Sequence, residues 1–181
     1  EAFGAAEVIE FLKKYEFRSL VQRFQPYASS ESKGKSNCEV HVIETEKDLV
    51  RLAEKLKKGF AYRIYEEEDG LFGFWAMAFS CQSGEGWWVE EGKLLREDVL
   101  RVLGPVFEDD TVSKTGHDVK EDMLKLHKNG VCLNGLRMDT MIAAYLLNPS
   151  KETYTEDELA QIFLQETIAS DDEVFGSGRE K

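Results

Sequence analysis

A run of four acids in the segment FAYRIYEEEDGL is the first feature that could support catalysis. The run, Glu66–Asp69, follows a stretch of aromatic and β-branched residues typical of a buried strand. Nucleases that use two metal ions need carboxylates on one face of a strand, which means positions i and i+2. Glu66 with Glu68, or Glu67 with Asp69, has that spacing. Acids beside a glycine more often form a solvent-exposed hairpin turn, and we favour that interpretation.

A second pair of acids lies in the segment KTGHDVKEDML. Asp118 and Asp122 are four residues apart, so they share one face of a predicted helix. Two like charges at this spacing destabilise a helix slightly, and a bound metal ion would offset their repulsion. Alternatively, Asp118 is the N-cap and the acids stabilise the positive end of the helix dipole. Lys114, His117 and Lys120 are close enough in sequence to neutralise them. We favour this second interpretation.

The remaining reactive side chains show no catalytic spacing. No histidine has a partner at metal-ligand distance in the sequence, and neither a nucleophile elbow nor a glycine-rich phosphate loop is present. For His117, beside Asp118, a surface turn is the better interpretation. The three cysteines are scattered and odd in number, which is typical of reduced thiols. The three histidines are His41, His117 and His127, and the three cysteines are Cys38, Cys81 and Cys132.

Three tryptophans could provide stacking platforms for single-stranded nucleic acid. Trp75 lies within an apolar strand, and Trp87 and Trp88 point to opposite faces of theirs. We therefore expect at least two of the three in the core.

The composition restricts the class of protein. The 181 residues include 42% hydrophobic residues, which is enough for a packed core, and 23 basic against 35 acidic residues give a charge of −12. A protein this acidic is not attracted to nucleic acid or to an anionic membrane by its overall field. No signal peptide is visible, and no apolar run is long enough to span a bilayer, so we expect a cytoplasmic location.

The elements that must position these residues follow from periodicity and turn signals. We predict strands over 39–43, 60–65, 71–80, 86–90, 111–115 and 132–138, and helices over 45–58, 96–107, 119–128, 139–147 and from 155 onwards. Short loops make the strands between 60 and 90 antiparallel neighbours. The order predicts an α/β fold of the ribonuclease H-like type. It has a mixed five-stranded sheet, with three antiparallel strands followed by parallel βα units, flanked by helices.

The N-terminal residues form a separate region. Residues 4–24 show helical spacing that predicts two short helices with a break near Tyr15–Phe17, and residues 28–37 are small and polar. We expect a helical piece over 1–27, a flexible linker over 28–38, and the main domain over 39–181.

The long segment KTGHDVKEDMLKLHKNGVCLNGLRMDTMIAAYLLNPS resembles the 3′–5′ exonuclease domain of bacterial DNA polymerase I, of the family A polymerases. The segments EVHVIETEKDL, FAYRIY, LFGFWAMAFS, GWWVE and TEDELAQIFL occur in the order of that family. EFLKKYEFRSLVQRF resembles the end of the preceding 5′-nuclease region. The resemblance covers nearly the whole chain and implies a ribonuclease H-like fold.

Active members of the family hold two divalent metals, usually Mg²⁺, with an Asp-x-Glu on a strand, an Asp on a later helix and a Tyr-x-x-x-Asp still later. By resemblance, Asp122 matches the helix Asp, and Asp118 stands where active members usually have Asn. The Asp-x-Glu falls on Arg63 and Tyr65, or, in a shifted alignment, on Tyr65 and Glu67. In both alignments the first Asp is missing. The last motif is expected beyond residue 181, in a domain truncated at its C-terminus.

The resemblance therefore implies a degenerate exonuclease domain without catalytic residues. At an effective dielectric of 20, a dication and a carboxylate 4 Å apart attract by roughly 8 kcal/mol, and Arg63 reverses the sign of that interaction. We expect no metal cofactor. Asp122, Asp118 and Glu67 are the ligands to consider if Mg²⁺ does bind. If Arg63 pairs with Asp122, its guanidinium takes the place of the metal.

The function expected from this resemblance is structural. The domain would bridge the 5′-nuclease and polymerase regions of a DNA-directed DNA polymerase in replication and repair, with DNA bound through the parent polymerase and no membrane partner. Two alternatives stay open. One is an active metal-dependent exonuclease with displaced ligands from Glu66–Asp69, Asp118 and Asp122. The other is a module that binds single-stranded DNA without cleaving it.

Overall fold

The computed structural model describes residues 38–67 and 74–170, and six positions before them: 8, 11, 12, 15, 17 and 20. The chain divides into two compact units, Glu1–Asn37 and Cys38–Lys181. Of the predicted linker over 28–38, residues 28–37 lie outside the described residues. In the first unit, the Tyr15 N–H donates to the Phe11 carbonyl and the Phe17 N–H to the Leu12 carbonyl, where the sequence predicts the end of a first helix.

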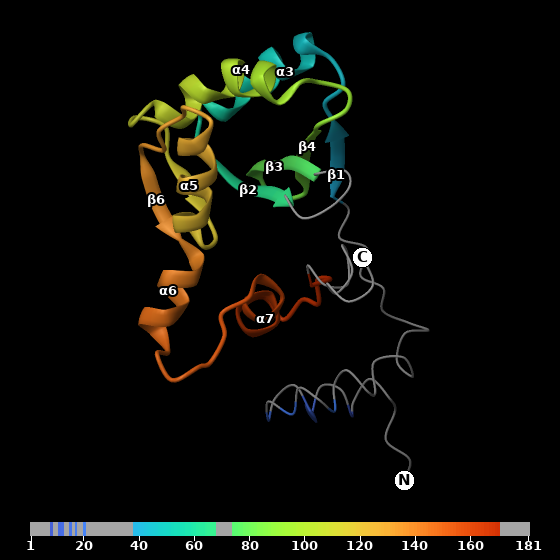
Figure 1. Ribbon diagram of the computed structural model, residues 1–181. Coiled ribbons are helices and arrows are strands. Elements are labelled where there is room, and N and C mark those ends of the chain that lie inside the picture. Colours follow the sequence, from blue (N-terminus) through green and yellow to red (C-terminus); the bar gives the residue numbers. More distant parts are fainter. Residues whose placement is uncertain are drawn as a thin grey trace. The chain divides into compact units, whose positions relative to one another are not determined.

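The second unit is built on a mixed sheet of six strands in the order β1-β4-β3-β2-β5-β6 (Figure 1). The prediction of an α/β, ribonuclease H-like mixed sheet is confirmed, but the count of five strands was wrong by one. The elements are β1 (Glu39–Val42), α3 (Glu46–Leu56), β2 (Phe60–Glu67), β3 (Phe74–Gln82), β4 (Glu85–Glu90), α4 (Arg96–Glu108), β5 (Lys114–Gly116), α5 (Val119–Lys128), β6 (Leu136–Asp139), α6 (Thr140–Leu147), α7 (Glu156–Leu159) and the π-helical η1 (Ala160–Leu164).

The pairing of the strands follows the predicted pattern. β2, β3 and β4 are antiparallel neighbours, whereas β5 and β6 continue the sheet in parallel beyond β2. The sheet has six strands because both edge segments pair with it. β1 pairs in parallel with β4 at one edge, and β6 pairs in parallel with β5 at the other. Both segments are only four residues long.

The main core lies between the sheet and the pair α3 and α4 (Figure 1). On β2, Phe60, Tyr62 and Ile64 are at most 5% exposed and point to this side. The ring of Phe107 on α4 lies 5.5 Å from that of Phe60 and 5.2 Å from that of Tyr62, each in an edge-to-face arrangement. Trp75 and Trp87 are also buried, which confirms the expectation for two of the three tryptophans.

Capping and glycine geometry decide where α3 begins and ends. The Thr45 hydroxyl accepts a hydrogen bond from the Asp48 N–H at 3.2 Å, so Thr45 is the N-cap of the helix. The helix ends at Leu56, and Gly59 has φ +99°. A side chain at Gly59 would also approach the Ser113 carbonyl to 3.2 Å, so the turn into β2 requires glycine.

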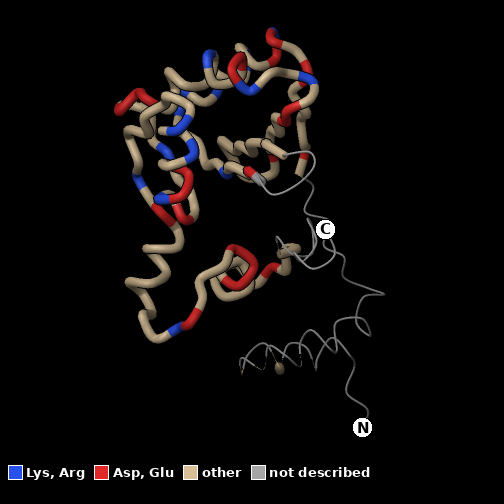
Figure 2. Tube along the Cα trace, in the orientation of Figure 1, with Lys and Arg blue, Asp and Glu red and all other residues tan. Residues whose placement is uncertain are grey.

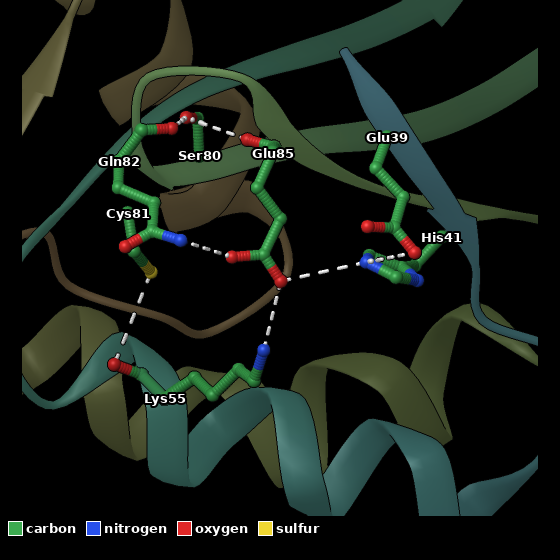
Figure 3. Close-up of polar contacts among 7 residues, drawn as sticks. All are labelled: Glu39, His41, Lys55, Ser80, Cys81, Gln82 and Glu85. Atoms are coloured by element: carbon green, nitrogen blue, oxygen red, sulfur yellow. Dashed lines mark hydrogen bonds and ion pairs between the residues drawn. The ribbon is translucent and has the colours of Figure 1, made fainter. Parts of the chain in front are cut away.

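A cluster of polar contacts links the edge strand β1 and helix α3 to the β3–β4 hairpin (Figure 3). The Glu85 carboxylate lies 2.9 Å from Lys55 Nζ and 3.4 Å from His41 Nε2, and it accepts a hydrogen bond from Gln82 Nε2 at 2.8 Å. The Lys55 hydrogen bond is the main cause that lowers the pKa of Glu85. His41 and Lys55 both contact the Trp87 ring. These contacts position a strand that is too short to be held by its backbone bonds alone.

The boundaries differ most from the predictions after residue 110. β6 begins at Leu136 rather than 132, because Val131 and Leu133 are drawn into the core and Gly135 turns with φ +67°. The last helix begins after Thr155 as predicted, but from Ala160 it continues with π-type bonding. Within the residues that the structure describes, no helix combines the length and apolar composition needed to cross a membrane.

Candidate functional site

β2 presents two residues where the resemblance places the first metal ligands. Arg63 and Tyr65 alternate with Tyr62 and Ile64, so they lie on the face opposite the main core. The Tyr65 ring packs on the half-buried Trp88, with 5.6 Å between centroids, and the Arg63 guanidinium carbon lies 5.7 Å from the centre of the Tyr65 ring. This face of the strand therefore carries a cation and an aromatic pair rather than two carboxylates.

Arg63 forms an ion pair with α7. Its Nη1 lies 3.3 Å from Glu156 Oε2, and the two side chains are 24% and 39% exposed. The structure therefore pairs Arg63 with Glu156 rather than with Asp122, the partner considered from the sequence. Arg63 still acts on Asp122 through its charge, because it lowers the pKa of that carboxyl group. A carboxylate from the C-terminal part of the chain thus neutralises the guanidinium.

Asp122 on α5 is buried, with 3% of its surface exposed. Its Oδ1 lies 3.8 Å from Lys125 Nζ, and its Oδ2 has no hydrogen-bond partner in the structure. Burial raises the pKa of Asp122 to about 7; Lys125 and Arg63 oppose this shift, and Asp118 and Glu121 add to it. With no metal ion bound, the group is therefore about half protonated near neutral pH.

The Tyr62 hydroxyl adds a second buried polar atom to this region. It has no hydrogen-bond partner in the structure, and burial, together with the charges of Asp122 and Asp139, raises its pKa. The phenol therefore stays neutral at any physiological pH. A neutral phenol and a half-protonated carboxyl group cost less to bury than two charges would.

Asp139 is the acid that the sequence analysis missed. Its Oδ1 accepts hydrogen bonds from the Met141 and Ile142 N–H groups at 2.9 and 3.3 Å, so it caps α6 rather than starting it. Its Oδ2 accepts from the Val119 N–H at 2.8 Å, in the first turn of α5. One buried carboxylate thus satisfies the starts of two helices. The pattern of Asp followed by Thr before an apolar run was the available signal.

Asp118 has the position of an N-cap without the bonds of one. It precedes α5 with φ 51° and ψ 50°, and its side chain makes no capping hydrogen bond. The prediction that Asp118 caps the helix is right for the position and wrong for the contact, because Asp139 supplies the acceptor. A left-handed residue cannot turn its side chain back toward the first helical N–H groups as an extended N-cap does.

The basic residues before α5 do not neutralise its acids as predicted. His117 is buried rather than in a surface turn, and its Nδ1 lies 2.8 Å from Thr140 Oγ1. The Thr140 hydroxyl donates to the Gly116 carbonyl, which leaves its oxygen to accept the His117 Nδ1–H. Lys114 is fully buried and donates to the Asp109 carbonyl after α4, and burial lowers its pKa. Both side chains join elements of the fold.

Glu66, the residue of the acidic run whose side chain the structure describes, has a partner on α4 rather than a place beside Asp122. Glu66 pairs with Arg96 of α4 at 2.7 Å, and its side chain is 7% exposed, so the prediction of a solvent-exposed turn was wrong for this residue. It lies on the core face of β2, whereas Arg63 lies on the other. Glu67 ends the strand, but its side chain lies outside the described residues, as do Glu68 and Asp69.

The described residues do not fit a two-metal centre. Among them, no group of three or more His, Cys, Asp and Glu residues is arranged to hold a metal ion. A cavity of about 420 Å³, lined in part by Lys58, Ser80 and Thr115, lies near the start of β2 and includes neither Arg63 nor Asp122. The two strongest charged neighbours of Asp122 are the cations Lys125 and Arg63, and the acids Asp118 and Glu121 follow.

A match to a protein-family model shows to which family the chain belongs. The family model "DNA polymerase I, ribonuclease H-like domain" matches residues 72–181. The chain belongs to this family. DNA polymerase I from Bacillus subtilis is 22% identical over the whole chain, which spans 20% of that protein. DNA polymerase I from Geobacillus stearothermophilus is 33% identical over 40% of the chain and 8% of that protein. The chain thus spans a fifth or less of these relatives.

Solved structures show the same exonuclease-like fold. The polymerase domain of Pol1 from M. smegmatis, in complex with DNA primer-template and dNTP, matches 72% of this chain and 23% of that chain, with 26% identity and a TM-score of 0.59. The catalytic core of RRP6 from Trypanosoma brucei matches 80% of this chain and 40% of that chain, with 20% identity and a TM-score of 0.63, which shows the fold alone. This chain is an exonuclease-like domain of the DNA polymerase I family.

Proposed function

We propose that this domain is a catalytically inactive, vestigial 3′–5′ exonuclease domain whose role is structural. It would join the 5′-nuclease and polymerase regions of a cytoplasmic DNA polymerase I that acts in replication and repair. The observation that carries the proposal is the ion pair between Arg63 and Glu156. It stands where the family resemblance expects the first metal-binding Asp.

Electrostatics supports the loss of the metal site. Two magnesium ions carry four positive charges and need several oxygen ligands between them. Arg63 places a cation on the strand where the resemblance expects a carboxylate, and Tyr65 packs its ring on Trp88. Asp122 is the family ligand position that is matched in either alignment, and its two strongest charged neighbours are the cations Lys125 and Arg63. A cation in place of a carboxylate on the strand therefore weakens the binding of dications.

An active exonuclease with displaced ligands has less support. Glu66 would have to leave Arg96 and cross to the opposite face of β2 to reach a metal beside Asp122. Asp118 adds a negative charge near Asp122, but it sits in a left-handed turn before the helix. Rebuilding a site from these acids requires breaking this part-buried ion pair, in which Arg96 is 27% and Glu66 7% exposed.

A module that binds single-stranded DNA is favoured by one observation. Tyr65, Trp88 and Phe74 form an aromatic cluster beside Arg63, with the Phe74 and Trp88 ring centroids 6.3 Å apart. Bases could stack on such a surface. The charge of −12 opposes it, and Glu156 already neutralises Arg63. An anisotropy titration with a short oligonucleotide at two salt concentrations tests this reading, since phosphate contacts give a salt-dependent affinity.

The deciding experiment is an exonuclease assay of the longer polymerase I protein that contains this domain. The substrate is single-stranded DNA with a 3′ label, in the presence of Mg²⁺ or Mn²⁺. We expect Asp122→Ala to leave the rate of shortening unchanged, at the same background as the exposed neighbouring variant Glu121→Ala. Shortening that Asp122→Ala abolishes and Glu121→Ala keeps would overturn the proposal.

A further inference from the structure

Two asparagine–glycine pairs lie between α5 and β6. They are Asn129–Gly130 and Asn134–Gly135, and both asparagines are exposed. In such a pair the backbone nitrogen of glycine can react with the asparagine side-chain amide, because glycine has no side chain to hinder the approach. This reaction is one reason why asparagine is a heat-labile residue. Since both pairs consist of the same two residues, the structure around each decides which one reacts.

The side-chain amides of the two asparagines are held in the same way. Asn129 Nδ2 donates a hydrogen bond to the Lys125 carbonyl at 2.8 Å, and Asn134 Nδ2 donates one to the Glu108 carbonyl at 2.9 Å. Each bond restrains the rotation of its amide about the side-chain bonds. The two asparagines are therefore restrained to a similar degree, and these bonds do not distinguish the pairs.

The backbone nitrogens of the two glycines differ. The Gly130 N–H donates to the His127 carbonyl at 3.0 Å, where α5 ends, so reaction at Gly130 requires the helix end to open. In contrast, the Gly135 N–H makes no hydrogen bond among the residues that the structure describes. Gly135 joins the sheet through its carbonyl, which accepts from the Lys114 N–H at 3.0 Å. Its nitrogen is thus available to lose a proton and form a new bond.

The fold requires glycine at position 135. A Cβ atom there would collide with the Val112 carbonyl oxygen and would lie 2.9 Å from that of Asp110. The backbone also has φ +67°, which other residues rarely adopt. A bulkier residue, which would slow the reaction, is therefore excluded. The reactive pair is a consequence of how closely the loop after α4 packs on the start of β6.

We propose that Asn134 is a site of spontaneous deamidation. The Gly135 nitrogen, on losing its proton to a solvent base, bonds to Cγ of Asn134 and closes a succinimide ring. The bond from Cγ to Nδ2 breaks, and the amide nitrogen takes up a proton and leaves as ammonia. Water then opens the ring at either of its carbonyl carbons, which gives aspartate or isoaspartate. No electrons are transferred, and water is the co-reactant.

The product changes the contact between α4 and the start of β6. A carboxylate at position 134 has no N–H to donate to the Glu108 carbonyl. It also brings a negative charge to the carboxyl end of α4, where the helix dipole is negative and a run of acidic residues is drawn in red (Figure 2). Isoaspartate in addition lengthens the backbone just before β6. Both products therefore weaken the hydrogen bond from the Lys114 N–H to the Gly135 carbonyl.

Peptide mapping by mass spectrometry tests the proposal in the longer polymerase I protein that contains this domain. The protein is incubated at mildly alkaline pH, either folded or unfolded in guanidinium chloride, and the conversion of Asn134 and of Asn129 is followed over time. The ratio of the two rates, Asn134 to Asn129, should be at least about threefold higher in the folded protein, because unfolding removes the hydrogen bond that engages Gly130. A ratio that is the same in both states overturns the proposal. So does a folded protein in which Asn129 converts faster or neither asparagine converts.

A second measurement tests the structural consequence. Hydrogen exchange of the Lys114 N–H should become at least about threefold faster in Asn134→Asp, because this variant carries the product carboxylate in place of the amide. The matched variant Asn129→Asp, at the other asparagine–glycine pair, should leave that exchange unchanged. Equal exchange of the Lys114 N–H in the two variants overturns the proposed effect on β6.

Discussion

The two faces of β2 contrast in how their side chains find partners. Toward the main core, Phe60, Tyr62 and Ile64 pack against α4, and Glu66 pairs with Arg96 of the same helix. On the opposite face, Arg63 pairs with Glu156 of α7, far along the chain.

One face of β2 therefore contributes to the stability of the core, and the other carries the candidate functional positions. The core face follows from the alternation of polarity along the strand, which the sequence shows. The opposite face carries Arg63 and Tyr65, the positions that the resemblance links to metal binding, and here they contact Glu156 and Trp88. Substitutions on the first face should therefore cost the most, and those on the second should show how little these contacts contribute to stability.

The largest effect is expected from the core face. Phe107→Ala removes a fully buried ring that contacts Phe60, Tyr62 and Phe79, and it should lower the free energy of unfolding by about 3–5 kcal/mol. Urea unfolding followed by circular dichroism measures this. Leu147→Ala in the isolated chain is the control, since Leu147 is 72% exposed and should cost less than about 0.5 kcal/mol. Similar losses for both would contradict the assignment of the core.

The next effect depends on pH and concerns Asp122. Its folded pKa of about 7 lies above the ordinary 3.8, so its contribution to stability is full below pH 4 and is lost as the pH rises through 7. Asp122→Asn removes the ionisation and should stabilise the domain at pH 8 by at most about 4 kcal/mol, with little difference at pH 4. Thermal unfolding at both pH values checks this. A gain that is the same at both would show that burial of the charge is not the cause.

A smaller loss is expected when the shared cap is removed. Asp139→Ala leaves the N–H groups of Val119, Met141 and Ile142 without their acceptor and should destabilise the domain by about 2 kcal/mol. Asp118→Asn is the matched control at the formal N-cap of α5, because Asn tolerates the left-handed backbone. We expect it to change stability by less than about 0.5 kcal/mol. Equal losses in urea unfolding would mean that Asp118, not Asp139, caps α5.

The smallest effect is expected from the ion pair between Arg63 and Glu156. A double-mutant cycle of Arg63→Gln and Glu156→Gln should give a coupling energy of about 0.2–1 kcal/mol, because both side chains are partly exposed. The coupling should fall at high salt. A value above about 2 kcal/mol would show that the pair is a principal stabilising contact of α7, which its exposure does not indicate.

Much of the fold could be read from the sequence because its signals are local. The helical spacing of residues 45–58, the alternation along β2 and the short loops between residues 60 and 90 fix their elements within a few residues. The resemblance placed Arg63, Tyr65 and Asp122 at the candidate metal positions, and the family match supports the class of the domain. The bond from Val119 to Asp139 and the bond from Lys114 to the Asp109 carbonyl were not predictable, because they join different elements.

The sequence by itself determined the class of the domain and placed a cation, Arg63, on β2, since residue identity and order need no folding to be read. Only the tertiary structure decided the partners of the charged residues. Glu156 pairs with Arg63, burial raises the pKa of Asp122, and Asp139 caps two helices at once. Each of these depends on groups that are distant in the chain and brought together by packing, and the energy of a charge is set by such neighbours and by its exclusion from water.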